Sequence, residues 1–125
     1  MMKRCKGFTL IELLVVLAIV ATLLTLVVPR YVDRIDVAKE TVLRDNLRGV
    51  RDVIDKFYGD RGRFPDSLEE LVEKNYLKTL PVDPVTDSDT TWQIVEVPSG
   101  HKGRVYDIRS GAPGNGRNGR PYAEW

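Results

Sequence analysis

The chain has 125 residues, and its 19 Lys and Arg against 18 Asp and Glu give a formal net charge of only +1. This balance excludes a strongly basic nucleic-acid binder and an acidic disordered chain. The length allows one small domain and leaves little room for a deep catalytic cleft. The single cysteine, Cys5, and the single histidine, His101, exclude an intrachain disulfide and a zinc site built from Cys and His.

The apolar residues are concentrated near the start of the chain. Residues 13–29 form a run of 17 without a charge. A helix over residues 8–29 would be about 33 Å long, close to the thickness of the hydrocarbon core of a bilayer. Lys3, Arg4 and Lys6 precede this run, whereas the charges just after it cancel. The distribution predicts one membrane span with a cytoplasmic N-terminus and the remainder of the chain outside.

Glu12 is the one ionisable residue in this apolar segment. A carboxylate at the bilayer centre costs about 2.5–3.5 kcal/mol on insertion scales, so one interpretation is a functional role with a positive partner at the same depth. The other is that Glu12 lies one turn into the helix and reaches the lipid headgroups. A secretory signal peptide or an ordinary signal anchor would explain the apolar run but not the acid.

Residues 7–12, Gly-Phe-Thr-Leu-Ile-Glu, resemble the processing signature of type IV pilins and pseudopilins. The resemblance covers the short basic leader, the glycine, the phenylalanine, the glutamate and Pro29. It implies that an inner-membrane prepilin peptidase cuts between Gly7 and Phe8 and methylates the new amino terminus of Phe8. The cut would supply the missing cation, because this amino group in one copy can pair with Glu12 of its neighbour in a filament.

Beyond Pro29, apolar residues recur at helical spacing, which predicts that an amphipathic helix continues over residues 30–58. Proline inside a helix removes a backbone donor, so we expect a kink or local melting near residues 28–30. The residues expected to pack against the rest of the domain are Ile35, Ala38, Val42, Leu43, Leu47, Val50, Ile54 and Phe57.

Residues 59–62 are expected to end this helix, since two glycines flank the segment. A short helix should follow, with Asp66 as its N-cap and an end near Asn75. Residues 80–84 contain two prolines and predict an extended connector.

Residues 91–97 and 104–109 are rich in β-branched and aromatic side chains and predict an antiparallel hairpin, with or without a third short strand. A lone hairpin is marginally stable, so it should lie on the long helix. Tyr122 and Trp125 are expected to anchor the C-terminus.

The order of these elements resembles that of the major pseudopilins of type II secretion. The matching segments are Gly62-Arg63-Phe64-Pro65, Tyr76-Leu77 and Leu80-Pro81-Val82-Asp83-Pro84. The resemblance implies an α+β, type IV pilin-like fold, in which a long bent N-terminal helix packs on a small antiparallel sheet with a short extra helix. The expected parts are a cleaved leader (1–7), a transmembrane and filament-core helix (8–29), its periplasmic amphipathic half (30–58) and a small globular region (59–125).

Relatives of this type commonly bind calcium in the loop after the sheet, where this chain offers Asn115, Asn118 and Glu124. Calcium takes about six to eight oxygen ligands, several of them carboxylates. The loop lacks the usual aspartates and carries Arg117 and Arg120 instead. We therefore expect no cofactor, with calcium as the lesser alternative, and an arginine–carboxylate clasp of Arg117 or Arg120 with Glu124 as the replacement.

Other patterns that carry chemistry are incomplete. His101 falls in a predicted exposed turn with no nucleophile nearby, and the glycine-rich residues 114–119 lack the lysine and the following helix of a phosphate loop. The acidic group Asp83, Asp87 and Asp89 is interpreted as a solvated loop. Arg44, Arg48 and Arg51 could contact phosphates, but interleaved aspartates oppose this. We expect neither catalysis nor a nucleic-acid partner.

The sequence thus predicts a structural subunit of the periplasmic pseudopilus of a type II secretion system, which drives protein export across the outer membrane. Before assembly it would be a single-pass inner-membrane protein with a periplasmic C-terminal domain. The implied partners are further copies in a helical homopolymer, the prepilin peptidase, the inner-membrane assembly platform and minor pseudopilins. The alternatives are a type IV pilin, a DNA-uptake (competence) pseudopilin and a signal-anchored binding domain whose leader stays intact.

Overall fold

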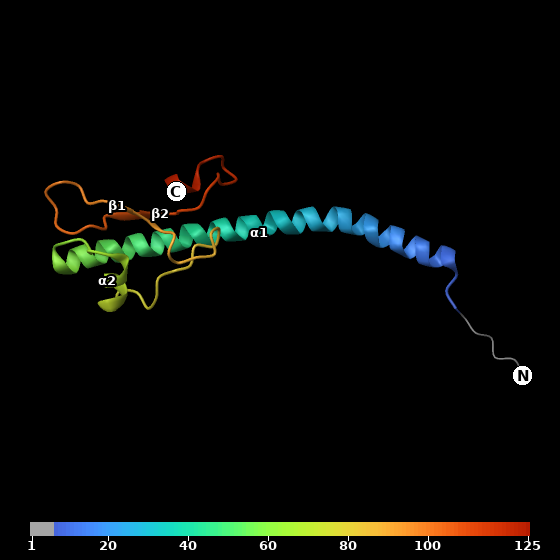
Figure 1. Cartoon of the computed structure of the whole chain (residues 1–125), viewed down its shortest axis with the longest axis horizontal. Coiled ribbons are helices and arrows are strands. Elements are labelled where there is room, and N and C mark those ends of the chain that lie inside the picture. The colour runs from blue at the N-terminus through green and yellow to red at the C-terminus, as the bar shows by residue number, and fades with distance from the viewer. Residues whose placement is uncertain (1–6) are drawn as a thin grey trace, which may run out of the picture. The chain divides into compact units, whose positions relative to one another are not determined.

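The computed structural model of the chain describes residues 7–125. The elements in chain order are helix α1 (Leu10–Arg61), helix α2 (Leu68–Glu73), strands β1 (Gln93–Val95) and β2 (Asp107–Arg109), and the 3-10 helix η1 (Tyr122–Glu124) (Figure 1). The chain divides into two units, Met1–Asp36 and Val37–Trp125, and α1 contributes to both. The α+β fold expected from the sequence is confirmed.

The described part of the first unit consists almost entirely of the apolar portion of α1. The helix continues through Pro29 without interruption, so the local melting expected there does not occur. A missing N–H removes one hydrogen bond, which the neighbouring turns of a long helix tolerate; the expected kink stays a prediction. The large apolar side chains from Leu10 to Val28 are 47–77% exposed. This unit therefore has no core of its own.

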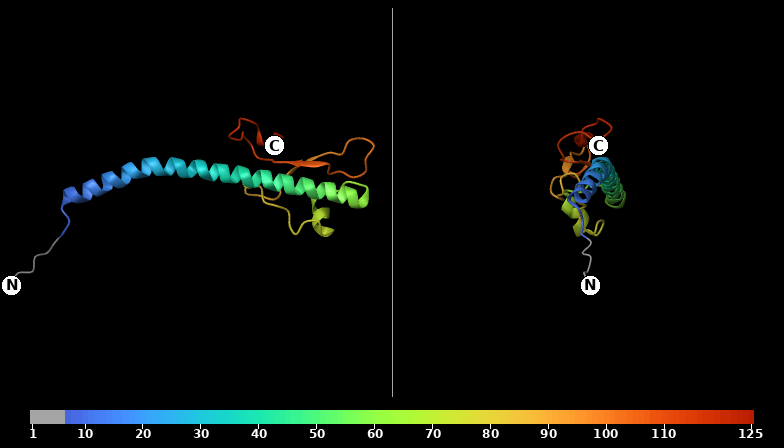
Figure 2. Two further views of the ribbon diagram at one scale, coloured as in Figure 1. Left: turned by 180° about the vertical axis from the view of Figure 1, so that it is seen from behind. Right: turned by 90° about the vertical axis from the view of Figure 1, so that its right-hand side faces the viewer.

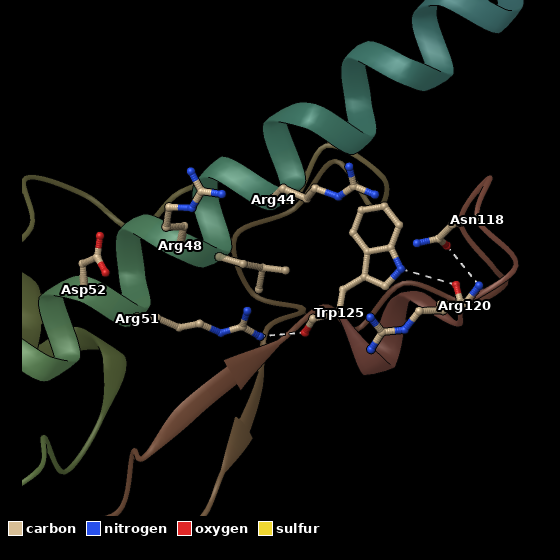
Figure 3. A pocket seen from close by; sticks show the side chains of 8 residues that line it. Arg44, Arg48, Arg51, Asp52, Asn118, Arg120 and Trp125 are labelled. Atoms are coloured by element: carbon tan, nitrogen blue, oxygen red, sulfur yellow. Dashed lines mark hydrogen bonds between the residues drawn. The ribbon is translucent and has the colours of Figure 1, made fainter.

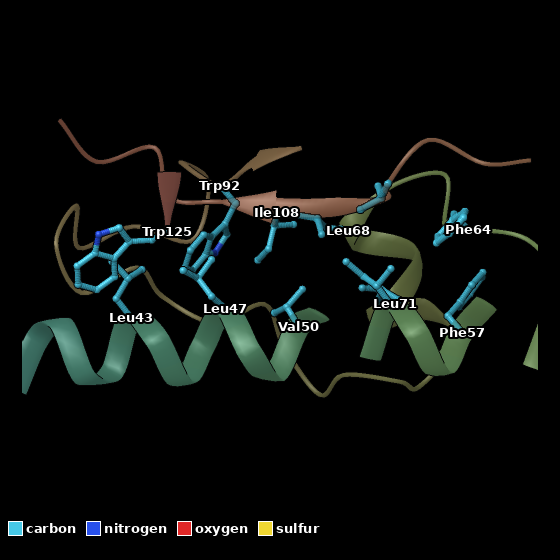
Figure 4. Close-up of a cluster of buried hydrophobic side chains, with 12 residues drawn as sticks. Leu43, Leu47, Val50, Phe57, Phe64, Leu68, Leu71, Trp92, Ile108 and Trp125 are labelled. Atoms are coloured by element: carbon cyan, nitrogen blue, oxygen red, sulfur yellow. The ribbon is translucent and has the colours of Figure 1, made fainter. Parts of the chain in front are cut away.

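The second unit is organised around one face of α1. Leu43, Leu47 and Phe57 on this face are at most 2% exposed. Figure 4 shows them pointing toward side chains from α2, β2 and the C-terminus. The other members of this cluster are Val50, Ile54, Phe64, Leu68, Leu71, Trp92, Val105, Ile108 and Trp125. The long helix thus supplies the floor on which the rest of the unit packs.

The first part of the predicted buried stripe is wrong. Ile35 and Val42 are 37% and 47% exposed, whereas Leu43 is fully buried. Adjacent residues on a helix point about 100° apart, so Val42 and Leu43 cannot share one narrow face. Burial in α1 starts at Glu40, where the C-terminal loop begins to cover the helix. The spacing of apolar residues allowed either Val42 or Leu43 to be buried. The sequence does not show at which residue the rest of the unit begins to cover α1.

The boundary between α1 and α2 differs by a few residues from the expected one. Gly62 adopts a left-handed conformation (φ +68°) and donates its N–H to the carbonyl of Tyr58 at 2.8 Å, so α1 extends to Arg61. The N-cap of α2 is Ser67, whose Oγ accepts the N–H of Glu70 at 3.2 Å. The assignment of Asp66 as the cap is therefore wrong, because the extended residue next to the first turn is Ser67.

An ion pair fixes the loop that joins these two helices. Arg63 Nη2 lies 2.6 Å from Glu70 Oε1, and the Glu70 side chain is only 12% exposed. Burial opposes ionisation of this carboxylate, but the contact with Arg63 and the N–H of Asp66 outweigh burial and lower the pKa of Glu70. The contact with Glu70 in turn raises the pKa of Arg63. The Gly-Arg-Phe-Pro segment thus has a structural role.

Strands β1 and β2 pair antiparallel with Ile94 opposite Ile108, as the sequence predicts. Each has three residues and is shorter than expected. The N–H groups of Arg104 and Val105 donate to the carbonyl of Pro65, at 3.0 and 2.9 Å, and so leave the ladder. Residues 7–125 contain no third strand. The strands and the C-terminal segment run along one side of residues 37–61 of α1, and α2 lies on another (Figure 2).

The connector at residues 80–84 is neither helix nor regular strand, in agreement with its two prolines. Asp83 is fully buried. Its Oδ2 accepts the hydroxyl of Ser110 at 2.5 Å, and its Oδ1 accepts the N–H of Val85 at 2.9 Å. Asp83 is therefore not part of a solvated acidic loop, although Asp87 and Asp89 are exposed. It ties the connector to the chain that follows β2.

Candidate functional site

The first turn of α1 holds the glutamate singled out by the sequence. Glu12 Oε2 accepts the N–H of Thr9 at 3.0 Å, and the N–H of Glu12 donates to Thr9 Oγ1 at 3.1 Å. This reciprocal pair is a capping box, which satisfies two backbone donors at the start of a helix. The carboxylate also lies at the positive end of the helix macrodipole. Glu12 thus has a partner within its own chain, next to the expected cut.

The peptide bond between Gly7 and Phe8 precedes α1 in non-helical backbone. Phe8 is 90% exposed, and a Cβ added at Gly7 would meet nothing within 4 Å. The two residues that flank the expected cut are therefore exposed and lie outside the helix. The predicted basic leader, including Lys3, Arg4, Cys5 and Lys6, lies outside the described residues.

Between Glu12 and Pro29, the surface of α1 is apolar, and its threonine hydroxyls are satisfied within the helix. The Thr22 hydroxyl donates to the carbonyl of Ala18 at 2.8 Å, and the Thr25 hydroxyl donates to that of Thr22 at 2.6 Å. Lipid tails or the apolar helices of other copies are media in which such a surface is stable. By length and composition, α1 is the one helix in residues 7–125 that could cross a membrane.

The C-terminal loop, residues 110–121, is fastened to α1 by protein groups. Glu40 on α1 is 7% exposed, and its Oε1 accepts the N–H of Arg117 at 2.8 Å and the hydroxyl of Tyr122 at 3.0 Å. Arg51 Nη2 donates to the terminal main-chain oxygen of Trp125 at 2.6 Å, and Trp125 is 9% exposed. The expected anchoring of the C-terminus by Tyr122 and Trp125 is confirmed.

Several oxygens of this loop that could bind calcium already accept hydrogen bonds. Asn118 Oδ1 accepts the N–H of Arg120 at 3.0 Å, and the carbonyls of Gly114 and Gly116 also accept backbone N–H groups. Glu124 is exposed, and its main-chain carbonyl accepts a hydrogen bond from Arg120 Nη2 at 3.0 Å. Within residues 7–125, no group of three or more acidic, His or Cys side chains could hold a metal. Arg120 thus binds the main chain of Glu124, and the expected clasp to the Glu124 carboxylate is wrong.

A cavity of about 360 Å³ lies between α1 and this loop. We call it the arginine pocket, because four guanidinium groups line it together with an indole ring. Figure 3 shows Arg44 and Arg51 reaching from α1 toward Trp125 at the C-terminus, beside Arg120, whereas the Arg48 guanidinium at the rim points away from them. The guanidinium of Arg44 is 4.6 Å from the centre of the Trp125 ring, a cation–π contact. The C-terminal residue thus forms one wall of a cationic cavity.

Sequence reasoning missed two residues that the structure brings into these sites. Thr9 had a visible signal, because Thr-x-x-Glu at the start of an apolar run is the pattern of a capping box. Glu40 had none, because its two partners lie 77 and 82 residues further along the chain. In the sequence it is one of the charges after the apolar run that cancel one another.

An exposed apolar helix with a glutamate at its start, joined to a small α+β unit, defines the class of prepilin-type filament subunits. Residues 2–28 match the model of the prokaryotic N-terminal methylation motif. The chain is 38% identical to type II secretion system core protein G of Pseudomonas aeruginosa over 98 residues, which cover 66% of this chain and 69% of the relative. It belongs to the core protein G family, whose members are pseudopilins.

Two further relatives allow the pseudopilin and pilin assignments to be compared. Core protein G of Escherichia coli K12 is 29% identical over 124 residues, covering 86% of this chain and 81% of the relative. A type IV major pilin of Myxococcus xanthus is 29% identical over 68 residues, covering 54% of this chain and only 31% of the pilin. The pseudopilin assignment therefore has more support than the pilin alternative. Among solved structures, no significant match to the chain was found.

Proposed function

We propose that this chain is a structural subunit of the periplasmic pseudopilus of a type II secretion system and has no catalysis of its own. The observation that carries the proposal is a single carboxylate, Glu12, at the start of a helix whose other side chains through Pro29 are uncharged and exposed. Membership of the core protein G family supports it. The subunit is held in the inner membrane by the apolar part of α1 and then joins a periplasmic filament.

Processing prepares the subunit for assembly. The prepilin peptidase cuts between Gly7 and Phe8 and methylates the amino group of Phe8. The exposure of Phe8 and the open space around Gly7 suit such a cut. The leader carries the basic residues and stays on the cytoplasmic side, so the second unit lies in the periplasm.

Assembly then uses the new amino terminus. The Phe8 amino group of one copy pairs with Glu12 of a neighbouring copy in an environment without water, where an unpaired charge is costly and a paired charge fixes the stagger between helices. The capping box supplies a waiting state, because Thr9 satisfies the carboxylate before a neighbour arrives. Pro29 adjusts the helix within the filament. The inner-membrane assembly platform and minor pseudopilins start and feed the filament.

Three substitutions separate the charge of Glu12 from its capping role. Glu12→Ala removes both, Glu12→Gln keeps an acceptor for the Thr9 N–H but removes the charge, and Thr9→Val keeps the charge but removes the hydroxyl. In cells with a complete secretion system, we expect all three variants to be processed to a chain that begins at N-methylated Phe8. We expect both Glu12 variants to be absent from filaments and Thr9→Val to be incorporated.

Mass spectrometry of the purified chain and shearing of filaments from overproducing cells provide the two measurements. Normal filaments from Glu12→Gln would show that the charge is dispensable and would contradict the proposed pairing. A mature chain that begins at Met1 would contradict the processing step.

A further inference from the structure

The arginine pocket carries positive charge that the chain does not neutralise. Arg51 is paired, because its Nε lies 2.7 Å from Asp107 Oδ1. Arg48 is exposed and, among the described residues, makes no hydrogen bond or ion pair, while Arg44 has only its contact with the Trp125 ring. Asp52 supplies the one acidic side chain in the lining, and the terminal main-chain oxygen of Trp125 is already held by Arg51. The pocket therefore presents at least two guanidinium groups to a ligand that must bring its own negative charge.

A second cavity on the same unit has the opposite character. We call it the acidic groove; it has a volume of about 320 Å³ and lies between α2 and the segment that leads into β1. Glu69 and Asp89 are the acidic residues of its lining, and Trp92 and Ile94 are among the apolar ones. Both acids are exposed and, within residues 7–125, neither makes an ion pair or a hydrogen bond. Ile94 is 47% exposed, so the groove also leaves apolar surface in water.

We infer that the arginine pocket of one copy binds the acidic groove of the next copy in the filament, with Arg44 and Arg48 on Asp89 and Glu69 of the neighbour. This inference rests on the proposed function. The two surfaces are different and complementary in charge, so a contact between them is heterologous, and a heterologous contact that does not close into a ring generates an open helical filament. The apolar walls of the groove exclude water from the pairs, which strengthens them.

With this contact, the two units would have different roles in assembly. Apolar helix surfaces and Glu12 set the stagger in the first unit, whereas the pocket and groove fix the rotation of one periplasmic unit against the next. Arginine suits this task, because its planar guanidinium binds a carboxylate through two parallel hydrogen bonds and therefore fixes orientation as well as distance.

Charge reversal tests the inference on the full chain in cells with a complete secretion system. Arg48 and Asp89 are exposed and unpaired, so Arg48→Glu and Asp89→Arg should leave the fold intact. We expect each single variant to be processed normally and to yield about tenfold fewer filaments, and the double variant, with the pair exchanged, to recover most of the loss. Glu96→Arg is the matched control, because Glu96 is exposed outside the groove; it should assemble normally.

Cross-linking provides a second, independent measurement. In a Cys5→Ser background, Arg48→Cys combined with Asp89→Cys should give a ladder of multimers with a short bis-maleimide reagent, and Arg48→Cys with Glu96→Cys should not. Filaments that form normally from Arg48→Glu and Asp89→Arg, or that give no ladder, would overturn the inference and leave the proposed function intact. Absence of filaments from the unmodified chain would instead refute the proposed function.

The same variants separate a second copy from nucleic acid as the ligand. A short DNA duplex that binds the purified chain in a salt-sensitive manner, and loses binding in Arg48→Glu while filaments stay normal, would reassign the pocket to phosphate binding.

Discussion

Glu12 and Glu40 lie on the same helix, yet they represent two different solutions for a carboxylate. Glu12 caps its own helix through Thr9, three residues away, and the surface around it is exposed and apolar. Glu40 is buried and accepts groups 77 and 82 residues away in sequence. Glu12 is thus satisfied within one turn of its own helix, whereas Glu40 is satisfied across the fold of the second unit.

This difference shows which unit must be covered by lipid or by other protein chains. Large apolar side chains from Leu10 to Val28 have no cover within the described chain, so lipid or neighbouring copies must provide it. The second unit has a closed core and needs no such cover to fold. Both tryptophans, Trp92 and Trp125, lie in that unit, so their fluorescence reports its unfolding alone.

The largest expected effect contrasts the two units directly. Phe57→Ala removes a fully buried ring from the second unit and should lower its free energy of unfolding by about 3–5 kcal/mol. Leu24→Ala removes a side chain that is 53% exposed in the first unit and should leave tryptophan-monitored unfolding of the full chain in detergent unchanged. A similar shift in both variants would contradict the independence of the two units.

A smaller effect is expected at the buried carboxylate. Glu40→Ala leaves the Arg117 N–H and the Tyr122 hydroxyl without their shared acceptor and should destabilise the second unit by about 2 kcal/mol. Glu40→Gln keeps an oxygen acceptor and should lose less. The measurement is the tryptophan-monitored melting temperature, with Glu69→Ala as the control because that carboxylate is exposed and unpaired among the described residues. Equal stability of Glu40→Ala and the unmodified chain would show that the hydrogen bonds from Arg117 and Tyr122 to Glu40 do not stabilise the unit.

The contrast also explains what the sequence could predict. The apolar run, the glycine–phenylalanine–glutamate motif and the helical spacing are local patterns, and they were enough for the long helix, the α+β class and the family. The short strands, the N-cap at Ser67 and the exposure of Val42 depend on competition between nearby partners. Arg104 and Val105 donate to Pro65 instead of extending the strand, Ser67 caps α2 instead of Asp66, and Leu43 is buried instead of Val42.

The candidate sites divide along the same line. Gly7, Phe8 and Glu12 carry a contiguous motif, so sequence alone selects them, although their roles in processing and assembly stay predictions. The arginine pocket joins α1 to the last residue of the chain. Asp83 and Ser110 likewise meet across a gap of 27 residues. No periodicity or spacing encodes such contacts, because they arise only when the globular region folds onto the helix.

The ion pair in the loop between α1 and α2 predicts a pH-dependent difference. Because the folded state lowers the pKa of Glu70 from its usual value of 4.5, the pair stabilises the second unit above that pH, and the stabilisation is lost as the pH falls through the lower folded pKa. Arg63→Met should therefore reduce the melting temperature at neutral pH, by less than Glu40→Ala does. The melting temperatures of Arg63→Met and of the unmodified chain should converge at acidic pH. A constant difference at all pH values would indicate that the substitution removes packing instead of an ion pair.

Removal of calcium is expected to have the smallest effect of all. The loop that would bind it is closed by Glu40, Arg51 and Arg120, and the Asn118 amide oxygen and the carbonyls of Gly114 and Gly116 already accept hydrogen bonds. A chelator should therefore leave the melting temperature of the second unit unchanged, in the unmodified chain and in Glu40→Ala alike. Added calcium should not rescue Glu40→Ala, because that substitution removes an oxygen instead of vacating a metal site. A large drop in the melting temperature of the unmodified chain with chelator would show that an ion binds through oxygens that the structure pairs with N–H groups. The conclusion that Glu40, Arg51 and Arg120 close the loop without a metal would then be wrong.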